Sequence, residues 1–181
     1  MKLTNDTLKK IYPYSTQANR ERYLPFLNQY MEEYRINAPN RASAFLAQIG
    51  HESGQLRYSE EIASGAAYEG RRNIGNIYKG DGKKFKGRGL IQITGRTNYT
   101  EISKAWNIDF LSNPELLSTP EYAVKSACWW WAKRGLNELA DAGTEATFKN
   151  ITRIINGGYN GYQDRYNIWQ KAKQYLNETK Q

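Results

Sequence analysis

A glycine-rich stretch from Gly65 to Gly95 constrains the fold most strongly, because it interrupts the helical patterning of the chain. It holds more than half of the 15 glycines, and apolar residues no longer recur within it at three- and four-residue spacing. Near its end, the sequence LIQIT at residues 90–94 is typical of a short strand. The pattern predicts a small, partly β lobe at about residues 65–95, which is inserted into a helical body and forms one wall of a cleft.

On both sides of this stretch, apolar residues recur at the spacing of one helix face. The expected helices cover residues 3–12, 19–34, 39–53, 97–106, 120–133, 137–142, 145–155 and 162–176. Pro39 suits the first turn of its helix, and Gly54 suits the end. With 181 residues and no internal repeat, the chain fits a single domain, residues 1–181, of mainly α architecture.

Glu52 is the most informative position, because its carboxyl group extends the apolar stripe of a helix at the helix's C-terminal end. The stripe consists of Ala42, Phe45, Leu46 and Ile49. Neither apolar surroundings nor the negative end of a helix dipole favours a charged carboxylate. The position therefore favours a protonated carboxyl group that serves as a general acid.

Glycoside hydrolysis needs a second carboxylate opposite such an acid, either to activate water or to attack the sugar. Glu60, Glu61 and Glu69 follow Glu52 closely enough in sequence to be compared for this role. Aromatic side chains are plentiful, with 14 tyrosines and 5 tryptophans, and flat rings commonly pack on sugar faces. A Glu60–Glu61 doublet is ordinarily solvated surface, however, so residue patterns alone leave the partner of Glu52 open.

The net charge of +8 and a sequence pI near 9.5 indicate a polyanionic partner, such as nucleic acid, an anionic membrane surface or a cell wall. The sequence has no nucleic-acid-binding motif, P-loop or dinucleotide fingerprint, so nucleic acid is not expected. Cys128 and His51 are the only residues of their kinds, which excludes an intramolecular disulfide and argues against a zinc site. We therefore expect no metal and no cofactor.

Four segments occur in the order, and with the residue types, of a known enzyme family. They are AFLAQIGHESG at residues 44–54, EEI at 60–62, GRGLIQITG at 87–95 with Asn98-Tyr99 behind it, and IINGG at 154–158 with Asp164-Arg165 behind it. Together they resemble family 19 of the glycoside hydrolases, which comprises plant-type chitinases and many phage endolysins. The resemblance covers about residues 39–176. It implies a lysozyme-like, two-lobed fold in which a small β element lines the cleft.

The resemblance also implies a role for each matching residue. Glu52 would be the general acid and Glu61 the general base, in an inverting reaction that needs roughly 6.5–9.5 Å between the two carboxyl groups. Thr94 matches a hydroxyl group that helps to hold the water. Glu69 competes with Glu61 for the base role or supports the site. The residues expected to bind substrate are His51, Tyr68, Gln92, Asn98, Asn156 and Arg165, the last of which also tunes the electrostatics of the acid.

Chitin and peptidoglycan are both β-1,4-linked amino-sugar polymers, so the reaction alone does not discriminate between them. Chitinases of the family usually carry a glutamate and a cysteine just after Asn-Gly-Gly, where this chain has Asn160-Gly161. The segment AAYEGR at residues 66–71, the compact size and the basic charge resemble phage endolysins. We therefore expect an endolysin, a muramidase that cleaves between N-acetylmuramic acid and N-acetylglucosamine and so lyses the host cell. A chitinase is the alternative.

The N-terminal sequence MKLTND does not resemble a signal peptide, and no segment approaches the ~20 apolar residues of a membrane span. We expect synthesis in the host cytoplasm, release through a holin-type pore and action on periplasmic or cell-wall peptidoglycan. The expected partners are peptidoglycan glycan strands and the anionic cell envelope, without stable membrane insertion. The expected state is a monomer.

Two other classes of protein stay open. A catalytically dead binding module would not need both Glu52 and Glu61. A basic membrane-disrupting protein would show a cationic amphipathic helix, and the segment 162–176 is a mild match, with Lys171, Lys173 and Lys180 in or near it. Packing of that helix against the core is the other interpretation.

Overall fold

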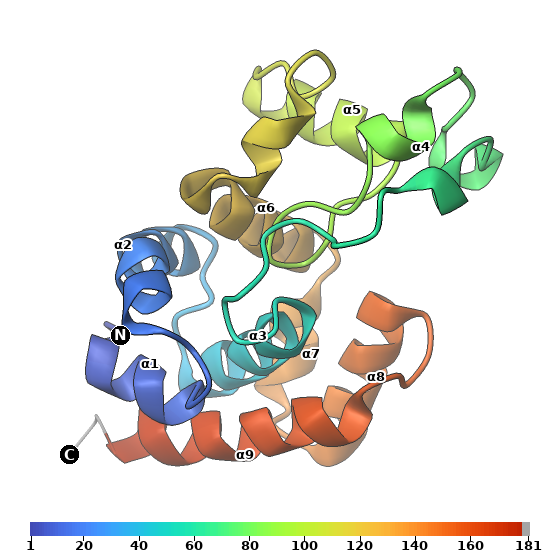
Figure 1. The fold of residues 1–181 in the computed structure, drawn as a ribbon. Coiled ribbons are helices and arrows are strands. Elements are labelled where there is room, and N and C mark those ends of the chain that lie inside the picture. Colours follow the sequence, from blue (N-terminus) through green and yellow to red (C-terminus); the bar gives the residue numbers. More distant parts are fainter. Residues whose placement is uncertain (179–181) are drawn as a thin grey trace. The chain divides into compact units, whose positions relative to one another are not determined.

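The computed structural model describes residues 1–178 (Figure 1). Their contacts group into two compact units. The first contains Met1–Arg57 and the chain from Cys128 onward, and the second contains Tyr58–Ala127. The second unit is thus inserted in the sequence of the first, and it extends on both sides beyond the residues 65–95 expected for a small lobe.

Helices build the first unit, and the mainly α fold expected from the sequence is confirmed. The helices are α1 (Asn5–Ile11), α2 (Gln17–Glu33), α3 (Pro39–Glu52), α7 (Leu136–Asp141), α8 (Glu145–Asn156) and α9 (Tyr162–Glu178), with the last turns of α6 (Pro120–Lys133). Each begins and ends within two residues of its expected bounds. Thr4, Thr16 and Thr144 cap α1, α2 and α8, because each side chain accepts a hydrogen bond from a first-turn N–H group.

The helix α3 forms the buried centre of the first unit. It packs against α9, which also contacts α1, and Figure 1 shows α9 in red running along both. The predicted apolar stripe of α3 is fully buried, and the Phe45 ring meets Trp131 edge-on with centroids 5.4 Å apart. Gly50 lies so close to Tyr12 that a Cβ atom there would stand 2.5 Å from the ring. Packing on several sides therefore fixes the helix that ends in Glu52.

The apolar face of α9 is buried inside the first unit. Ile168, Trp169, Ala172 and Leu176 are each at most 3% exposed. Trp169 stacks on Phe148 with ring centroids 4.4 Å apart. The packing interpretation of this helix is therefore correct for residues 162–178, whereas Lys180 lies outside the described residues. Within residues 1–178, no helix is long and apolar enough to cross a membrane.

The second unit consists of short helices joined by loops. They are η1 (Ala66–Tyr68), η2 (Arg72–Ile74), α4 (Asp81–Lys84), α5 (Arg96–Trp106), η3 (Pro114–Ser118) and the first turns of α6. The expected strand over residues 90–94 is wrong. Arg88 forms an isolated bridge to Ile93, and the residues between them turn, with positive φ at Gly89 (86°) and Gln92 (66°). An extended strand needs negative φ throughout, so the turn overrides the strand propensity of these side chains.

A buried ion pair stabilises the second unit and gives a prediction for acid stability. The Asp81 carboxylate is 2% exposed and accepts two hydrogen bonds from Arg96, both of 2.8 Å. These bonds lower the pKa of Asp81. A carboxylate with a lowered pKa stabilises the folded state above its ordinary pKa of 3.8, and this contribution is lost as the pH falls through the folded-state value.

We expect Asp81→Asn to lower the free energy of unfolding by about 2–3 kcal/mol at pH 7, because it leaves a half-buried guanidinium without its counter-charge. The difference from the parent protein should shrink below pH 4. Urea denaturation of both proteins at pH 7 and at pH 3 measures it, and an equal difference at the two pH values would contradict the assignment.

Candidate active site

The Glu52 carboxylate stands at the C-terminal end of α3 and is paired with a buried arginine. Arg165, in the first turn of α9, donates from Nη2 to Glu52 Oε1 at 2.6 Å. The Arg165 side chain is 1% exposed and that of Glu52 is 19% exposed. The sequence predicted apolar surroundings for Glu52, and the structure corrects this. The carboxyl group faces a guanidinium on one side and is partly open to solvent.

A chain of buried polar groups holds this guanidinium in place. Arg165 Nη1 donates to Gln48 Oε1 at 2.8 Å, and Gln48 Nε2 donates to Thr152 Oγ1 at 2.9 Å. Gln48 lies one helical turn before Glu52, so both side chains lie on the same face of α3. Both Gln48 and Thr152 are fully buried. Sequence reasoning missed these two residues, although a glutamine among the apolar residues of α3 was a signal.

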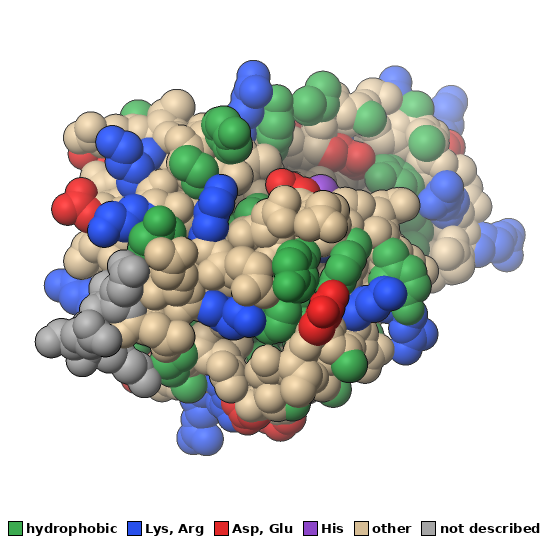
Figure 2. Space-filling view, turned by 90° about the horizontal axis from the view of Figure 1, so that it is seen from below, with side chains coloured by type: hydrophobic (Ala, Val, Ile, Leu, Met, Phe, Trp, Pro, Cys, Tyr) green, Lys and Arg blue, Asp and Glu red, His purple; other side chains and the backbone are tan. Residues whose placement is uncertain are grey.

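His51 joins the same two helices beside the Glu52–Arg165 pair. Its Nδ1 lies 2.7 Å from Asp164 Oδ2. Figure 2 shows the single histidine, in purple, at the surface beside an acidic side chain in red. Two consecutive residues of α3 are therefore bonded to two consecutive residues of α9. The expectation that His51 binds substrate stays a prediction, and the ring has a structural partner in Asp164.

The loop between α8 and α9 is attached to this cluster. The Asn160 carbonyl oxygen accepts a hydrogen bond of 3.2 Å from Arg165 Nε. The Asn160 N–H group donates to Asn156 Oδ1 at 3.1 Å. Gly161 lies against the His51 ring, where a Cβ atom would stand 2.2 Å from Cε1. The structure thus gathers four predicted site residues, namely His51, Glu52, Asn156 and Arg165, around the start of α9.

In the second unit, both oxygens of the Glu61 carboxylate accept hydrogen bonds. Gly87 N–H donates to Oε1 at 2.6 Å, and the Tyr68 hydroxyl group donates to Oε2 at 3.1 Å. The Glu61 N–H group also donates to the Gly87 carbonyl oxygen at 2.9 Å. Glu61 is therefore fixed from both its backbone and its side chain, and Tyr68 acts here as a partner of Glu61. Its expected contact with substrate stays a prediction.

Gly87 brings further predicted residues close to Glu61. A Cβ atom at Gly87 would lie 2.5 Å from Gln92 Oε1 and 3.2 Å from Thr94 Oγ1, so only glycine leaves room for this approach. Thr94 donates from Oγ1 to the Gln92 carbonyl oxygen at 3.0 Å, and Asn98 Nδ2 donates to the Thr94 carbonyl oxygen at 2.7 Å. The structure therefore gathers Glu61, Tyr68, Gln92, Thr94 and Asn98 in one network.

The two other carboxylates that the sequence left open have structural partners. Glu60 Oε1 lies 3.2 Å from both Arg88 Nε and Lys86 Nζ. Glu69 accepts hydrogen bonds of 2.9 Å from the N–H groups of Gly80 and Gly82, one at each oxygen. These two bonds, the one from Gly82 first, lower the pKa of Glu69. The Glu69 carboxylate therefore binds the N-terminal end of α4, and this structural use of both oxygens favours Glu61 as the base.

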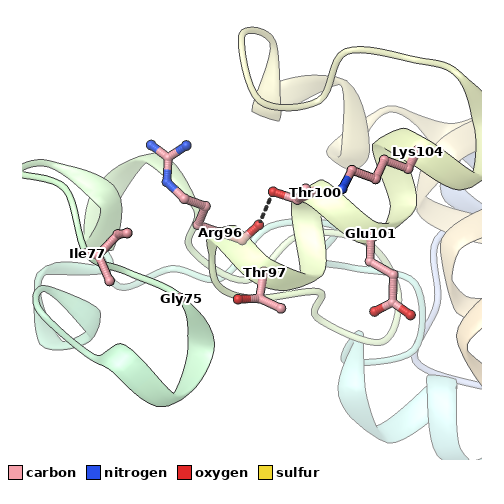
Figure 3. A pocket seen from close by; sticks show the side chains of 7 residues that line it. All are labelled: Gly75, Ile77, Arg96, Thr97, Thr100, Glu101 and Lys104. Atoms are coloured by element: carbon pink, nitrogen blue, oxygen red, sulfur yellow. Dashed lines mark hydrogen bonds between the residues drawn. The ribbon is translucent and has the colours of Figure 1, made fainter.

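A separate pocket of about 470 Å³ lies along α5 (Figure 3). It is lined by Gly75, Ile77, Arg96, Thr97, Thr100, Glu101 and Lys104. Figure 3 shows Thr97 and Glu101 on one side of α5 and Thr100 on the other, where Thr100 Oγ1 donates to the Arg96 carbonyl oxygen at 2.8 Å. None of the predicted site residues lines this pocket, and we assign it no catalytic role.

Among residues 1–178, no group of three His, Cys, Asp or Glu side chains is placed to hold a metal ion.

Comparison with known proteins identifies the family. The family model Glyco_hydro_19, chitinase class I, matches residues 24–140. A glycosyl hydrolase family 19 domain-containing protein of Haemophilus influenzae is 30% identical over 200 residues, which cover 93% of this chain and 94% of that protein. An endochitinase of Arabidopsis thaliana is 37% identical over 123 residues, which cover 67% of this chain but 40% of that protein. The chain thus matches less than half the length of this plant relative.

Solved structures share the fold. Chitinase C from Streptomyces griseus HUT6037 aligns with a TM-score of 0.72 at 24% identity, over 96% of this chain and 76% of that one. A family 19, class IV chitinase from Zea mays aligns with a TM-score of 0.73 at 23% identity, over 97% of this chain and 92% of that one. These likenesses extend across both units of the chain.

Proposed function

We propose that this chain, which belongs to glycoside hydrolase family 19 and so to enzymes that hydrolyse glycosidic bonds, acts on bacterial peptidoglycan. The bond cleaved is the β-1,4 linkage between N-acetylmuramic acid and N-acetylglucosamine. The observation that carries this proposal is the residue type at position 160, in the loop whose backbone binds Arg165 Nε. This chain has Asn160 there, where chitinases of the family usually carry a glutamate.

The charge of the protein supports the same substrate. A net charge of +8 suits a polymer that carries carboxylates and phosphates better than it suits chitin, which is uncharged. Glycan strands of the anionic envelope are therefore the proposed partner, and the protein acts on them as a monomer without inserting into the membrane.

In the proposed mechanism, Glu52 gives its proton to the leaving glycosidic oxygen while Glu61 takes a proton from the attacking water. Water adds to the sugar carbon, the carbon–oxygen bond to the leaving sugar breaks, and the configuration inverts. Glu52 becomes negatively charged as the reaction proceeds. The Arg165 guanidinium, 2.6 Å away, stabilises that developing charge. Thr94 positions the water beside Glu61.

In its biological role, we propose that the protein is an endolysin that accumulates in the host cytoplasm and reaches the wall through a holin-type pore.

A chitinase is the second candidate, supported by relatives that are named endochitinases in Arabidopsis thaliana and Theobroma cacao. Destruction of membranes is a weaker alternative because the apolar face of α9 is buried. Lysis that survives Glu52→Gln would support it.

Mass spectrometry of borohydride-reduced products tests the substrate. We expect reduced N-acetylmuramic acid ends after incubation with purified peptidoglycan, and much slower cleavage of chitin oligomers. Reduced N-acetylglucosamine ends from peptidoglycan would indicate a glucosaminidase instead. Cleavage of chitin alone would make the protein a chitinase, and anhydro ends would exclude the water-activating role of Glu61.

A further inference from the structure

Tyr159 presents an aromatic ring to solvent in the loop between α8 and α9. The residue is 50% exposed, whereas the rings in the core of the first unit are buried. These buried rings are Tyr12, Tyr23, Tyr30, Phe45, Trp131, Phe148 and Trp169. A single exposed ring is not unusual in itself, so a function for this ring has to be inferred from what the ring and its loop contact.

The loop that carries Tyr159 is fixed to the partners of Glu52. The next residue, Asn160, accepts the hydrogen bond from Arg165 Nε through its carbonyl oxygen and donates its N–H to Asn156. The residue after that, Gly161, lies against the His51 ring. Tyr159 is therefore one residue away from a group that is bonded to the guanidinium holding Glu52. All of these groups belong to the first unit.

The orientation of the Tyr159 ring is also constrained. The Lys149 ammonium group, on α8, lies over the ring at 5.2 Å from its centroid. The same ammonium lies 5.7 Å from the Tyr162 ring, whose hydroxyl group donates to Glu145 at 3.0 Å. A cation over one face restricts the motion of the ring, and half of the residue's surface is still exposed to a ligand.

We propose that Tyr159 is a substrate-binding residue whose open face stacks on a sugar ring of the glycan. An amino-sugar ring has an apolar face of C–H groups that matches a flat aromatic surface. The Asn156 side chain, on the same loop, bonds to the Asn160 N–H through Oδ1, which directs its amide nitrogen away from that bond as a donor for sugar oxygens. The inference rests on the proposed function, because it takes the ligand to be a β-1,4-linked amino-sugar strand.

Binding without turnover tests this proposal. In a Glu52→Gln background, calorimetry measures the affinity for an N-acetylglucosamine hexamer and for glycan strands freed of their peptides. We expect Tyr159→Ala and Tyr159→Leu to weaken binding about tenfold, since each removes the flat ring. Tyr159→Phe and Tyr159→Trp should bind within about twofold of the parent. In the active enzyme, Tyr159→Ala should raise KM and leave kcat nearly unchanged.

Tyr14→Ala is the matched control, because Tyr14 is 86% exposed and lies in the same unit, in the α1–α2 loop. It should leave affinity and KM unchanged. Unchanged affinity in both Tyr159→Ala and Tyr159→Leu would overturn the proposal, as would equal losses in Tyr159→Phe and Tyr159→Ala. If the Glu52→Gln parent binds neither glycan, the proposed function itself fails, which is a different result from a loss confined to the Tyr159 variants.

Discussion

Replacing Glu52 by glutamine is expected to abolish glycan hydrolysis and to leave the fold intact. Glutamine has nearly the same shape, and its carbonyl oxygen can still accept the 2.6 Å hydrogen bond from Arg165 Nη2. It has no carboxyl proton to give, so the leaving oxygen must depart as an alkoxide. General acid catalysis contributes about 10²–10⁴ to a rate, so turnover of purified peptidoglycan should fall by at least that factor.

Comparing substrates with different leaving groups distinguishes the loss of the general acid from structural damage to the site. A glycoside with a dinitrophenolate leaving group needs no protonation, so Glu52→Gln should lose much less activity on such a substrate than on the natural glycan. Glu21→Gln is the matched control, because Glu21 is an exposed carboxylate of the first unit bonded to Gln17. It should be fully active. Equal losses on both substrates would contradict the role assigned to Glu52.

The helix α3 shows what periodicity can predict from one sequence. Its apolar stripe, its start at Pro39 and its end before Gly54 follow from local rules, and the structure matches them. The position of Glu52 on that helix follows with them. The electrostatic setting of Glu52 does not follow, because its partner Arg165 lies 113 residues later in the chain. The role of Gln48 cannot be predicted from local rules either, since its bond to Arg165 spans 117 residues.

Residues 90–94 show where local rules fail. Ile and Thr favour a strand, yet Gly89 and Gln92 adopt positive φ and close a turn that bridges Arg88 to Ile93. The turn is stabilised from outside, because the Gly89 N–H donates to Ser59 and the Leu90 N–H donates to Ala123. Contacts of this kind depend on tertiary structure and are invisible to a propensity argument.

The roles of the three later glutamates could not be ranked from residue types either. Glu61 and Glu69 are both carboxylates within one turn-rich segment, and only the hydrogen bonds distinguish them. Glu69 has one backbone N–H on each oxygen and no site residue among its partners. Glu61 shares Gly87 with Gln92 and Thr94. The resemblance favoured Glu61, and the geometry gives a physical reason for that preference.

We accordingly expect Glu61→Gln to reduce turnover by about 10²–10⁴, through loss of the group that takes a proton from water. Its amide oxygen can keep the bond from Gly87 N–H, and its amide nitrogen can donate to the Tyr68 hydroxyl oxygen, so the fold should persist. Glu69→Gln is the matched comparison in the same unit. It should cost less than tenfold in turnover and should lower the melting temperature, because an amide nitrogen would face a backbone donor.

Rescue by azide distinguishes the loss of the general base from structural damage to the site. Azide is already an anion and attacks carbon without giving up a proton, so it needs no general base. In Glu61→Ala, where the side chain is shortened, added azide should restore turnover and yield a glycosyl azide of inverted configuration. It should not restore Glu52→Ala, because the leaving oxygen still lacks its proton. Rescue of Glu69→Ala by azide, together with a larger loss in Glu69→Gln than in Glu61→Gln, would transfer the role of base to Glu69.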